Sequence, residues 1–179
     1  MRIYLIGYSY AGKSTMARQL AARLGLQSFD TDLAIEYKYH TSIPMFFQRY
    51  GEQAFRIVEQ QMLQTTANMD NIVVATGGGT ACSEANIQFI LSHGIAIHME
   101  MTVDDIMLRM AKAHKSRPSL IGKSREEQRQ YITSQLTERL PYYRQAQLHL
   151  PALHANAEQL EALLKSYTAM LPNEESLPH

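Results

Sequence analysis

The chain has 179 residues, 45% of them hydrophobic, a length that fits one well-buried domain better than two. Its 17 basic and 17 acidic residues cancel, which argues against nucleic acid or an anionic membrane as partner and favours small molecules. Cys82, the single cysteine, cannot form an internal disulfide, and no apolar run reaches the roughly 18 residues that span a bilayer. Since Met1 leads straight into a strand without a secretion signal, we expect the chain to be cytoplasmic. We also expect a monomer, with one domain over 1–170 and a tail over 171–179.

The first predicted element is an apolar strand at residues 3–6 that runs directly into a glycine-rich loop. This loop reads GYSYAGKST and fits the pattern GxxxxGKS/T. In that pattern backbone N–H groups and a helix N-terminus surround a polyphosphate. Gly7 and Gly12 keep side chains out of the way, Lys13 reaches the β/γ-phosphates and Ser14 binds Mg²⁺. A glycine-rich turn before an ordinary helix is the weaker alternative.

Two carboxylates follow the second predicted strand, residues 27–30. Asp30 ends the strand and Asp32 begins the next helix, so both are expected near the phosphate loop. One could support Mg²⁺ through water and the other could hold an acceptor hydroxyl. Capping of the helix by aspartate explains the same spacing equally well.

Two arginines on predicted helices are further candidates for the site. A helical segment over residues 42–68, broken at Gly51, carries Arg56 with Glu59 one turn later. Such pairs on a helix are usually exposed to solvent, which is the competing interpretation. Arg139 lies before a Pro-Tyr-Tyr run, where a simple helix end is the alternative.

A third candidate is the run Gly77-Gly78-Gly79. It directly follows a predicted buried strand at residues 71–75. Glycines at the carboxyl end of a strand leave backbone exposed and allow a ligand to approach closely. A merely flexible loop is the alternative.

The rest of the chain continues the alternation of strands and helices. We predict strands at 95–99 and 148–150. We also predict four helices: one at 84–92, one that starts at about 102 with a Thr102–Asp105 capping box, one that ends at about 139, and one at 156–170. A polar stretch, 112–126, separates two of the helices. These elements predict an α/β protein with three layers, α/β/α, around a central parallel sheet of about five strands. The ligand is expected at the carboxyl ends of the strands.

Taken in order, these motifs resemble those of one family, the shikimate kinases, within the nucleoside monophosphate kinase-like group of P-loop proteins. The resemblance extends over most of the chain, and the order and spacing agree throughout. The motifs are the loop 7–15, Asp30-Thr31-Asp32, Ser42-Ile43 through Phe46, Gly51-Glu52, Phe55-Arg56 with Glu59, Gly77-Gly78-Gly79, Arg117-Pro118, and Arg139 with Tyr143 and Ala146.

The resemblance implies phosphorylation of the 3-hydroxyl of shikimate by ATP, with Mg²⁺, as a step of aromatic amino-acid biosynthesis. It implies a P-loop kinase fold with a substrate-binding helical part over about 32–68 and a lid over about 112–126. The implied catalytic residues are Asp32, Lys13 and Arg117. The implied ATP-binding residues are Gly7, Ala11, Gly12, Lys13, Ser14, Thr15, Arg109, Arg117 and Ala155. The implied shikimate-binding residues are Asp32, Arg56, Gly77, Gly78, Gly79 and Arg139, and the implied metal-binding residues are Ser14 and Asp30.

The chemistry of these residues suits shikimate, which carries one carboxylate and three hydroxyls on a ring. Arg56 and Arg139 offer planar guanidinium groups for the carboxylate. Asp32 can hold the reacting hydroxyl, and we give its positioning more weight than its basicity, because a loose transition state demands little of a base. Arg117 would close over the nucleotide with the lid.

Three other functions are alternatives to this one. A kinase for another carboxylate-bearing metabolite, such as gluconate, is the nearest alternative, and a catalytically silent ATP-binding module is the next. A silent module would have lost Asp32, Arg56 or Arg117, and all three residues are present. A GTPase is disfavoured because the chain has no Asn-Lys-x-Asp run. The seven histidines show no H-x-H or H-E-x-x-H spacing, so no transition-metal site is expected.

Overall fold

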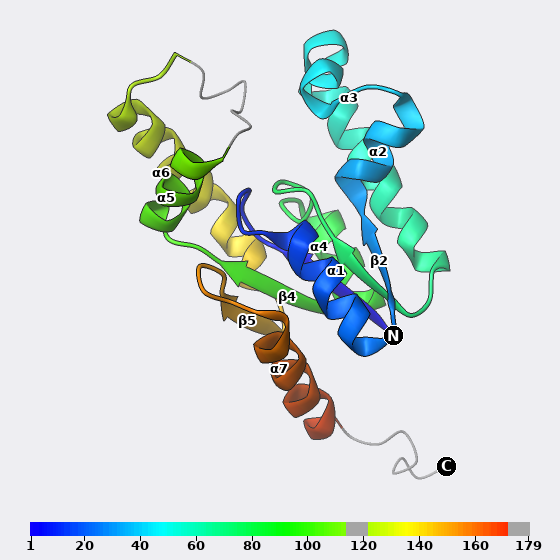
Figure 1. Ribbon diagram of the computed structural model, residues 1–179. Coiled ribbons are helices and arrows are strands. Elements are labelled where there is room, and N and C mark those ends of the chain that lie inside the picture. Colours follow the sequence, from blue (N-terminus) through cyan, green and yellow to red (C-terminus); the bar gives the residue numbers. More distant parts are fainter. Residues whose placement is uncertain (114–121, 172–179) are drawn as a thin grey trace.

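The computed structural model describes residues 1–113 and 122–171 of the chain (Figure 1). Strands and helices alternate along most of it. The elements are β1 (Arg2–Ile6), α1 (Lys13–Leu24), β2 (Gln27–Asp30), α2 (Thr31–Tyr39), α3 (Ile43–Thr65), a 3-10 turn (Thr66–Asn68), β3 (Ile72–Ala75), α4 (Glu84–His93), β4 (Ile95–Glu100), α5 (Val103–Lys112), α6 (Arg125–Tyr143), β5 (Leu148–Pro151) and α7 (Ala157–Met170).

The strands form one parallel sheet in the order β2-β3-β1-β4-β5. In the middle of the sheet, Ile3–Ile6 of β1 and all of β3 are apolar and buried, as expected for strands covered on both faces. The two edge strands, β2 and β5, have four residues each and are partly exposed. The predicted three-layer architecture around a parallel sheet of five strands is confirmed.

Helices cover both faces of the sheet. Helix α1 packs against α7 and against β2 and β3, whereas α4 packs against β4 and α3. In Figure 1, α1 lies in front of the sheet and α4 behind it. Two pairs of packed helices, α2 with α3 and α5 with α6, rise on either side of the phosphate loop (Figure 1). Among the described residues, no helix has both the length and the apolar character needed to cross a membrane.

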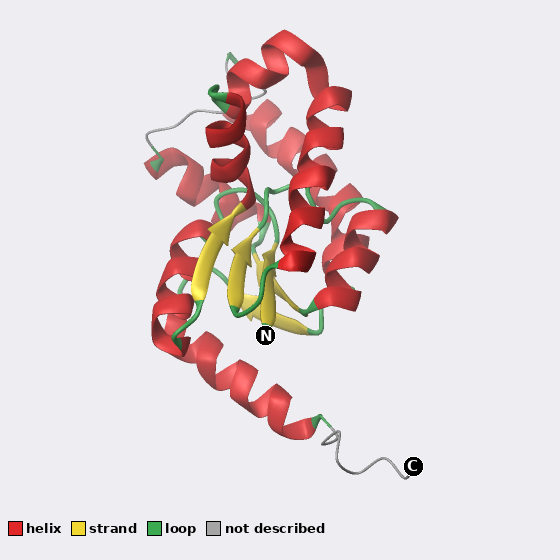
Figure 2. Cartoon of the chain, turned by 90° about the vertical axis from the view of Figure 1, so that its right-hand side faces the viewer, coloured by secondary structure: helices red, strands yellow, loops and turns green. Residues whose placement is uncertain are grey.

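The pair α2–α3 has a small apolar core separate from that of the sheet. Ile35 of α2 packs with Phe46, Phe55 and Met62 of α3. Gly51 interrupts α3 with a left-handed φ of 78° and a ψ of 173°, so the predicted break is confirmed. Figure 2 shows the long helices of this region standing above the sheet. The bend lets the two halves of α3 close around these aromatic rings.

The boundaries of α5 and α6 differ in part from expectation. The capping box of Thr102 and Asp105 at the start of α5 is confirmed. Helix α6 begins at Arg125, inside the polar stretch 112–126, because Ser124 and Glu127 form a second capping box. The predicted helix end at residue 139 is wrong. The helix continues through Pro141 to Tyr143, and its last turn is closed by a bond from the Arg144 N–H to the Leu140 carbonyl.

Candidate active site

The phosphate loop lies between β1 and α1, and two glycines set its path. Gly7 has a φ of 137°, and a Cβ there would lie 2.7 Å from the Met99 carbonyl oxygen of β4. Gly12 caps α1 with a left-handed φ of 84°. At Gly7 a side chain is excluded because it would collide with β4, and at Gly12 it is disfavoured by the left-handed backbone angle. The sequence motif therefore has the geometry that its glycines predicted.

The side chain of Lys13 is held inside this loop. Only 7% of the residue is exposed, and its Nζ donates to the carbonyl oxygens of Gly7 at 2.7 Å and Tyr8 at 2.9 Å. Ser14 and Thr15 are exposed on the first turn of α1. A positive charge and two hydroxyls thus lie together at a helix N-terminus, the combination that binds phosphate and its cation.

Arg109 of α5 joins the phosphate loop to the segment after β5. Its Nη1 donates to the Tyr10 carbonyl oxygen at 2.9 Å, and its Nη2 donates to the Leu153 oxygen at 3.0 Å and to the Ala152 oxygen. Ala155 lies half-buried in the same segment. Arg109 and Ala155, both assigned to ATP binding by resemblance, therefore lie in segments that Arg109 joins to the phosphate loop.

The two aspartates after β2 occupy different positions. Asp30 caps α2, because its Oδ1 accepts the backbone N–H groups of Asp32 at 3.0 Å and Leu33 at 3.1 Å. The capping interpretation is thus confirmed for Asp30. Asp32, on the first turn of α2, reaches the glycine triplet: a Cβ on Gly77 would lie 2.7 Å from Asp32 Oδ1.

Glu59 is the most buried charged group of the site, with 1% of the residue exposed. Its Oε2 accepts from Arg56 Nη1 at 2.7 Å, and its Oε1 accepts from Thr80 Oγ1 at 2.6 Å. The interpretation of Arg56 and Glu59 as a solvated pair is therefore wrong for the glutamate. Its partner Arg56 is also bound at 3.0 Å by the exposed Glu52.

The guanidinium of Arg56 lies against the glycine triplet, where a Cβ on Gly79 would be 2.5 Å from its Nη1. Burial alone would lower the pKa of Arg56, but the charges and hydrogen bonds of Glu59 and Glu52 outweigh it and raise the pKa above its ordinary value. Arg56 is therefore a fixed positive charge at the mouth of the site.

Arg139 approaches the same glycines from α6. Its Nη1 donates to the Gly78 carbonyl oxygen at 3.3 Å, its Nη2 donates to Gln135, and its guanidinium lies 5.2 Å from the centre of the Tyr8 ring. The Tyr143 hydroxyl donates to the same carbonyl. Burial raises the pKa of Tyr143 well above its ordinary value, so the hydroxyl keeps its proton as a donor. Residues of α6 thereby fix the glycine loop.

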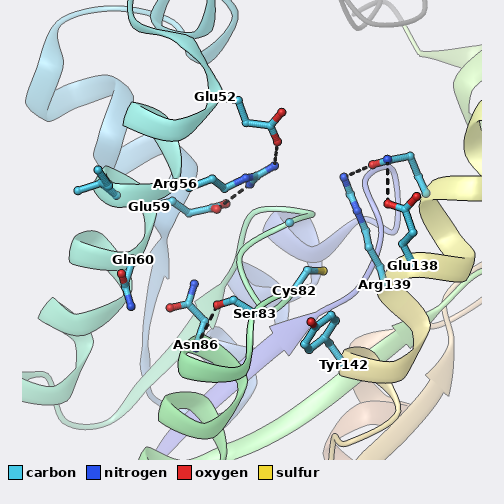
Figure 3. Close-up of a pocket in the computed structure, with 13 residues that line it drawn as sticks. Glu52, Arg56, Glu59, Gln60, Cys82, Ser83, Asn86, Glu138, Arg139 and Tyr142 are labelled. Carbon is cyan, nitrogen blue, oxygen red and sulfur yellow. Dashed lines mark hydrogen bonds and ion pairs between the residues drawn. The ribbon is translucent and has the colours of Figure 1, made fainter.

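A pocket of about 590 Å³ opens between α3 and α6. Figure 3 shows Arg56 and Glu59 entering from one side and Arg139 from the other, with Cys82, Ser83 and Asn86 between them. The lining residues are Glu52, Arg56, Ile57, Glu59, Gln60, Gly79, Cys82, Ser83, Asn86, Gln135, Glu138, Arg139 and Tyr142. The pocket thus joins three residues expected to bind substrate: Arg56, Gly79 and Arg139.

Several lining residues were not predicted as part of the site. Cys82 packs on the core, burial raises the pKa of its thiol, and the residue also lines the pocket. Ser83 and Asn86 follow the glycine triplet into α4, and Gln135 lies one turn before Arg139. Nearness in sequence to the glycine triplet, and for Gln135 to Arg139 on the same helix, was the signal that could have found them. Arg117 lies outside the described residues, as does the rest of 114–121.

The family model and the curated relatives agree on one family. The family model described as "Shikimate kinase" matches residues 10–170. A shikimate kinase of Parabacteroides distasonis is 35% identical over 151 residues, covering 84% of this chain and 87% of the relative. One from Salinibacter ruber is 37% identical over 174 residues, covering 94% and 85% of the two chains.

Solved structures agree with the sequences. A crystal structure of shikimate kinase from Bacteroides thetaiotaomicron has a TM-score of 0.84 at 32% identity, with 95% of this chain and 97% of the other covered. The Acinetobacter baumannii enzyme in complex with shikimate has a TM-score of 0.82 at 31% identity, with 96% and 95% covered. A deoxyadenosine kinase of M. mycoides, at 15% identity and a TM-score of 0.60, shares the fold alone. On the extent and agreement of these matches, the chain belongs to the shikimate kinase family.

Proposed function

We propose that the chain transfers the γ-phosphate of ATP to the 3-hydroxyl of shikimate. The observation that carries this proposal is the pocket between α3 and α6, where two arginines flank a glycine loop close to the phosphate loop. Relatives with the same fold are shikimate kinases, and one of them was solved in complex with shikimate. A small anionic acceptor and a nucleotide would then meet at the carboxyl ends of the strands.

The phosphate loop is the proposed site for ATP. Gly7, Ala11 and Gly12 shape the backbone around the phosphates, and Lys13 neutralises their charge during transfer. Ser14 and Thr15 offer hydroxyls at the helix N-terminus. Arg109 and the segment with Ala155 are proposed to bound the adenine end, because Arg109 ties that segment to the loop through its backbone carbonyls.

Mg²⁺ is the proposed metal cofactor, and the residues present fit it. The Ser14 hydroxyl is exposed beside the loop, and Asp30 uses only its Oδ1 in the bonds that cap α2. Oxygen donors of this kind suit a hard cation that keeps several water ligands. Mg²⁺ bound with ATP would neutralise the charge on the transferred phosphoryl group.

The acceptor pocket is proposed to bind the shikimate carboxylate through Arg56 and Arg139. Glu59 and Glu52 hold Arg56, and Gln135, the Gly78 carbonyl and the Tyr8 ring hold Arg139. Fixed guanidinium groups lose little side-chain freedom when a planar carboxylate binds. Gly77, Gly78 and Gly79 would let the ring approach the backbone closely.

Asp32 is proposed to hold the reacting hydroxyl. Its Oδ1 lies beside Gly77, the first residue of the glycine triplet. A carboxylate there aligns the hydroxyl oxygen with the γ-phosphate and accepts its proton as the new P–O bond forms. Arg117, outside the described residues, is proposed on the family resemblance to close over the phosphates with the lid, about 112–126.

The test is to replace each pocket arginine. Arg56→Ala and Arg139→Ala should each lower kcat/KM for shikimate by about 30- to several-thousand-fold, because a desolvated carboxylate loses 2–5 kcal/mol of pairing. Lysine at either position should recover only part of the loss, since an ammonium group does not form the bidentate fork. A coupled assay with ATP and Mg²⁺ measures both.

Two comparisons make this test specific. Arg49→Ala, at an exposed arginine of α3 outside the pocket, should leave kcat/KM near normal. A shikimate analogue with a neutral group in place of the carboxylate should be rejected by the unaltered protein about as strongly as the alanine variants reject shikimate. Equal activity on that analogue, or higher activity on gluconate, would overturn the acceptor assignment.

A further inference from the structure

A cluster of three side chains lies between β4 and β5, outside the pocket. His98 and Glu100 are two positions apart on β4, and so project from the same face of the strand. His149 of β5 is the direct register partner of His98 in the parallel ladder. Spacing in the sequence does not reveal this group, because the two histidines lie 51 positions apart and only the sheet brings them together.

The potential ligand atoms of this cluster converge. One nitrogen from each histidine and one oxygen of Glu100 all lie within 4.8 Å of one another. The oxygen Glu100 Oε1 is 3.2 Å from His149 Nδ1 and 3.9 Å from His98 Nδ1. Two ligands of a tetrahedral zinc ion with bonds of about 2.1 Å lie about 3.4 Å apart, so small side-chain rotations would bring all three into coordination.

The hydrogen bond at the outer nitrogen of His149 turns its Nδ1 toward the cluster. His149 Nε2 lies 3.1 Å from the Ala146 carbonyl oxygen, which only accepts, so that nitrogen carries a hydrogen. The other ring nitrogen, Nδ1, faces Glu100 Oε1 at 3.2 Å, where a metal ion between the two groups would bind both. A carbonyl partner on the outer nitrogen is typical of metal-ligating histidines.

The buried Nδ1 of His98 favours a metal ion in the cluster over a proton shared by His149 and Glu100. His98 is only 3% exposed, and its Nδ1 is buried without a hydrogen-bond partner among the described residues. A proton shared by His149 and Glu100 would leave this buried nitrogen unsatisfied, whereas a metal ion would use it.

We propose that His98, Glu100 and His149 bind a divalent transition-metal ion, with Zn²⁺ the best match to two imidazoles and a carboxylate. Three protein ligands leave a fourth position for water. The side chains of Glu100 and His149 are 46% and 35% exposed, which gives the ion a path from solvent. This proposal is independent of the proposed kinase function.

The ion would act on the structure of the sheet edge. It would tie the edge strand β5 to β4, and β5 leads directly to Ala152 and Leu153, whose carbonyls hold Arg109 against the phosphate loop. On its other side the cluster touches that loop, since a Cβ on Gly7 would lie 3.4 Å from His98 Cδ2. The expected effect is a gain in stability of the β4–β5 edge.

The experiment uses the full chain without a histidine tag, stripped with a chelator and titrated with Zn²⁺ alone. We expect one ion per chain by calorimetry and a Tm that rises with Zn²⁺, as linkage requires for a ligand of the folded state. Co²⁺ in place of Zn²⁺ should give the absorption of a four-coordinate site. His149→Ala and Glu100→Gln should each weaken binding by at least the 10–100-fold typical of losing even an outer partner of a metal site.

The control is His40→Asn, at an exposed histidine with a left-handed φ of 50° that asparagine tolerates. It should bind Zn²⁺ like the unaltered chain. Thermal unfolding without metal checks that the variants fold, and both altered ligands are partly exposed. No stoichiometric binding by the unaltered chain, or binding that neither ligand variant weakens, would overturn the proposal.

Discussion

The nucleotide end and the acceptor end of the site are built in different ways. The phosphate loop is one continuous run, residues 7–15, and its shape depends on two glycine backbones and on bonds from Lys13 to carbonyls of the same run. The acceptor end collects side chains from α2, α3, the loop after β3, and α6. One end is local in sequence, whereas the other exists only in the folded protein.

This difference predicts different responses to mutation. Loss of the Lys13 ammonium or of the Ser14 or Thr15 hydroxyl should remove chemistry while the fold persists, because Lys13 Nζ binds carbonyls of the same loop and the two hydroxyl residues are exposed. A change at the acceptor end should alter activity and stability together, because Glu59, Arg56 and Arg139 also hold helices and the glycine loop in place.

The largest effect is expected from Lys13→Ala. Without the ammonium group the β/γ-phosphates lose a partner at the moment of transfer, and we expect no detectable product in a coupled assay. Lys165→Ala, at an exposed lysine of α7, is the matched control and should be fully active. Near-normal turnover by Lys13→Ala would remove the phosphate loop from the mechanism.

Asp32→Asn tests the boundary between the two ends. Asparagine keeps the shape but loses the charged oxygens that hold the reacting hydroxyl in line, and we expect kcat to fall by about 10²-fold. Binding of ATP, measured by calorimetry, should change little. A loss confined to ATP affinity would place Asp32 at the nucleotide end instead.

The smallest effect, and the sharpest test of the coupling, comes from two glutamates that bind the same arginine. Glu59→Gln removes a buried charge with two bonds, and we expect a loss of about 1.5–3 kcal/mol, lowering Tm by roughly 3–12 °C. Glu52→Gln removes an ion pair in which the Glu52 side chain is 67% exposed. It should lower the free energy of unfolding by at most about 1 kcal/mol and Tm by less than about 4 °C. Equal shifts in thermal unfolding would show that burial of Glu59 adds nothing.

How far the sequence predicts the molecule follows the same division. The alternation of strands and helices, the phosphate loop and the break at Gly51 depend on local patterns, and these predictions are confirmed. The burial of Glu59 was missed because an Arg–Glu pair one turn apart looks the same on an exposed helix. What buries it is Thr80 and the glycine loop, more than 15 residues away in sequence.

The helix boundaries show a second reason for errors. Pro141 normally ends or kinks a helix, because it lacks an N–H and crowds the preceding turn. Here α6 continues to Tyr143, whose buried ring and hydroxyl bond to Gly78 stabilise the extra turn. The tertiary contact outweighs the local preference, and only the structure reveals it.

The short edge strands bear on how the protein behaves when it is concentrated. Unpaired strand edges can template pairing between chains and lead to aggregation. Here both edges are only four residues long, and β5 ends with Pro151, which has no N–H to offer a neighbour. Edge-to-edge pairing of two chains through the sheet is thereby disfavoured at both sides.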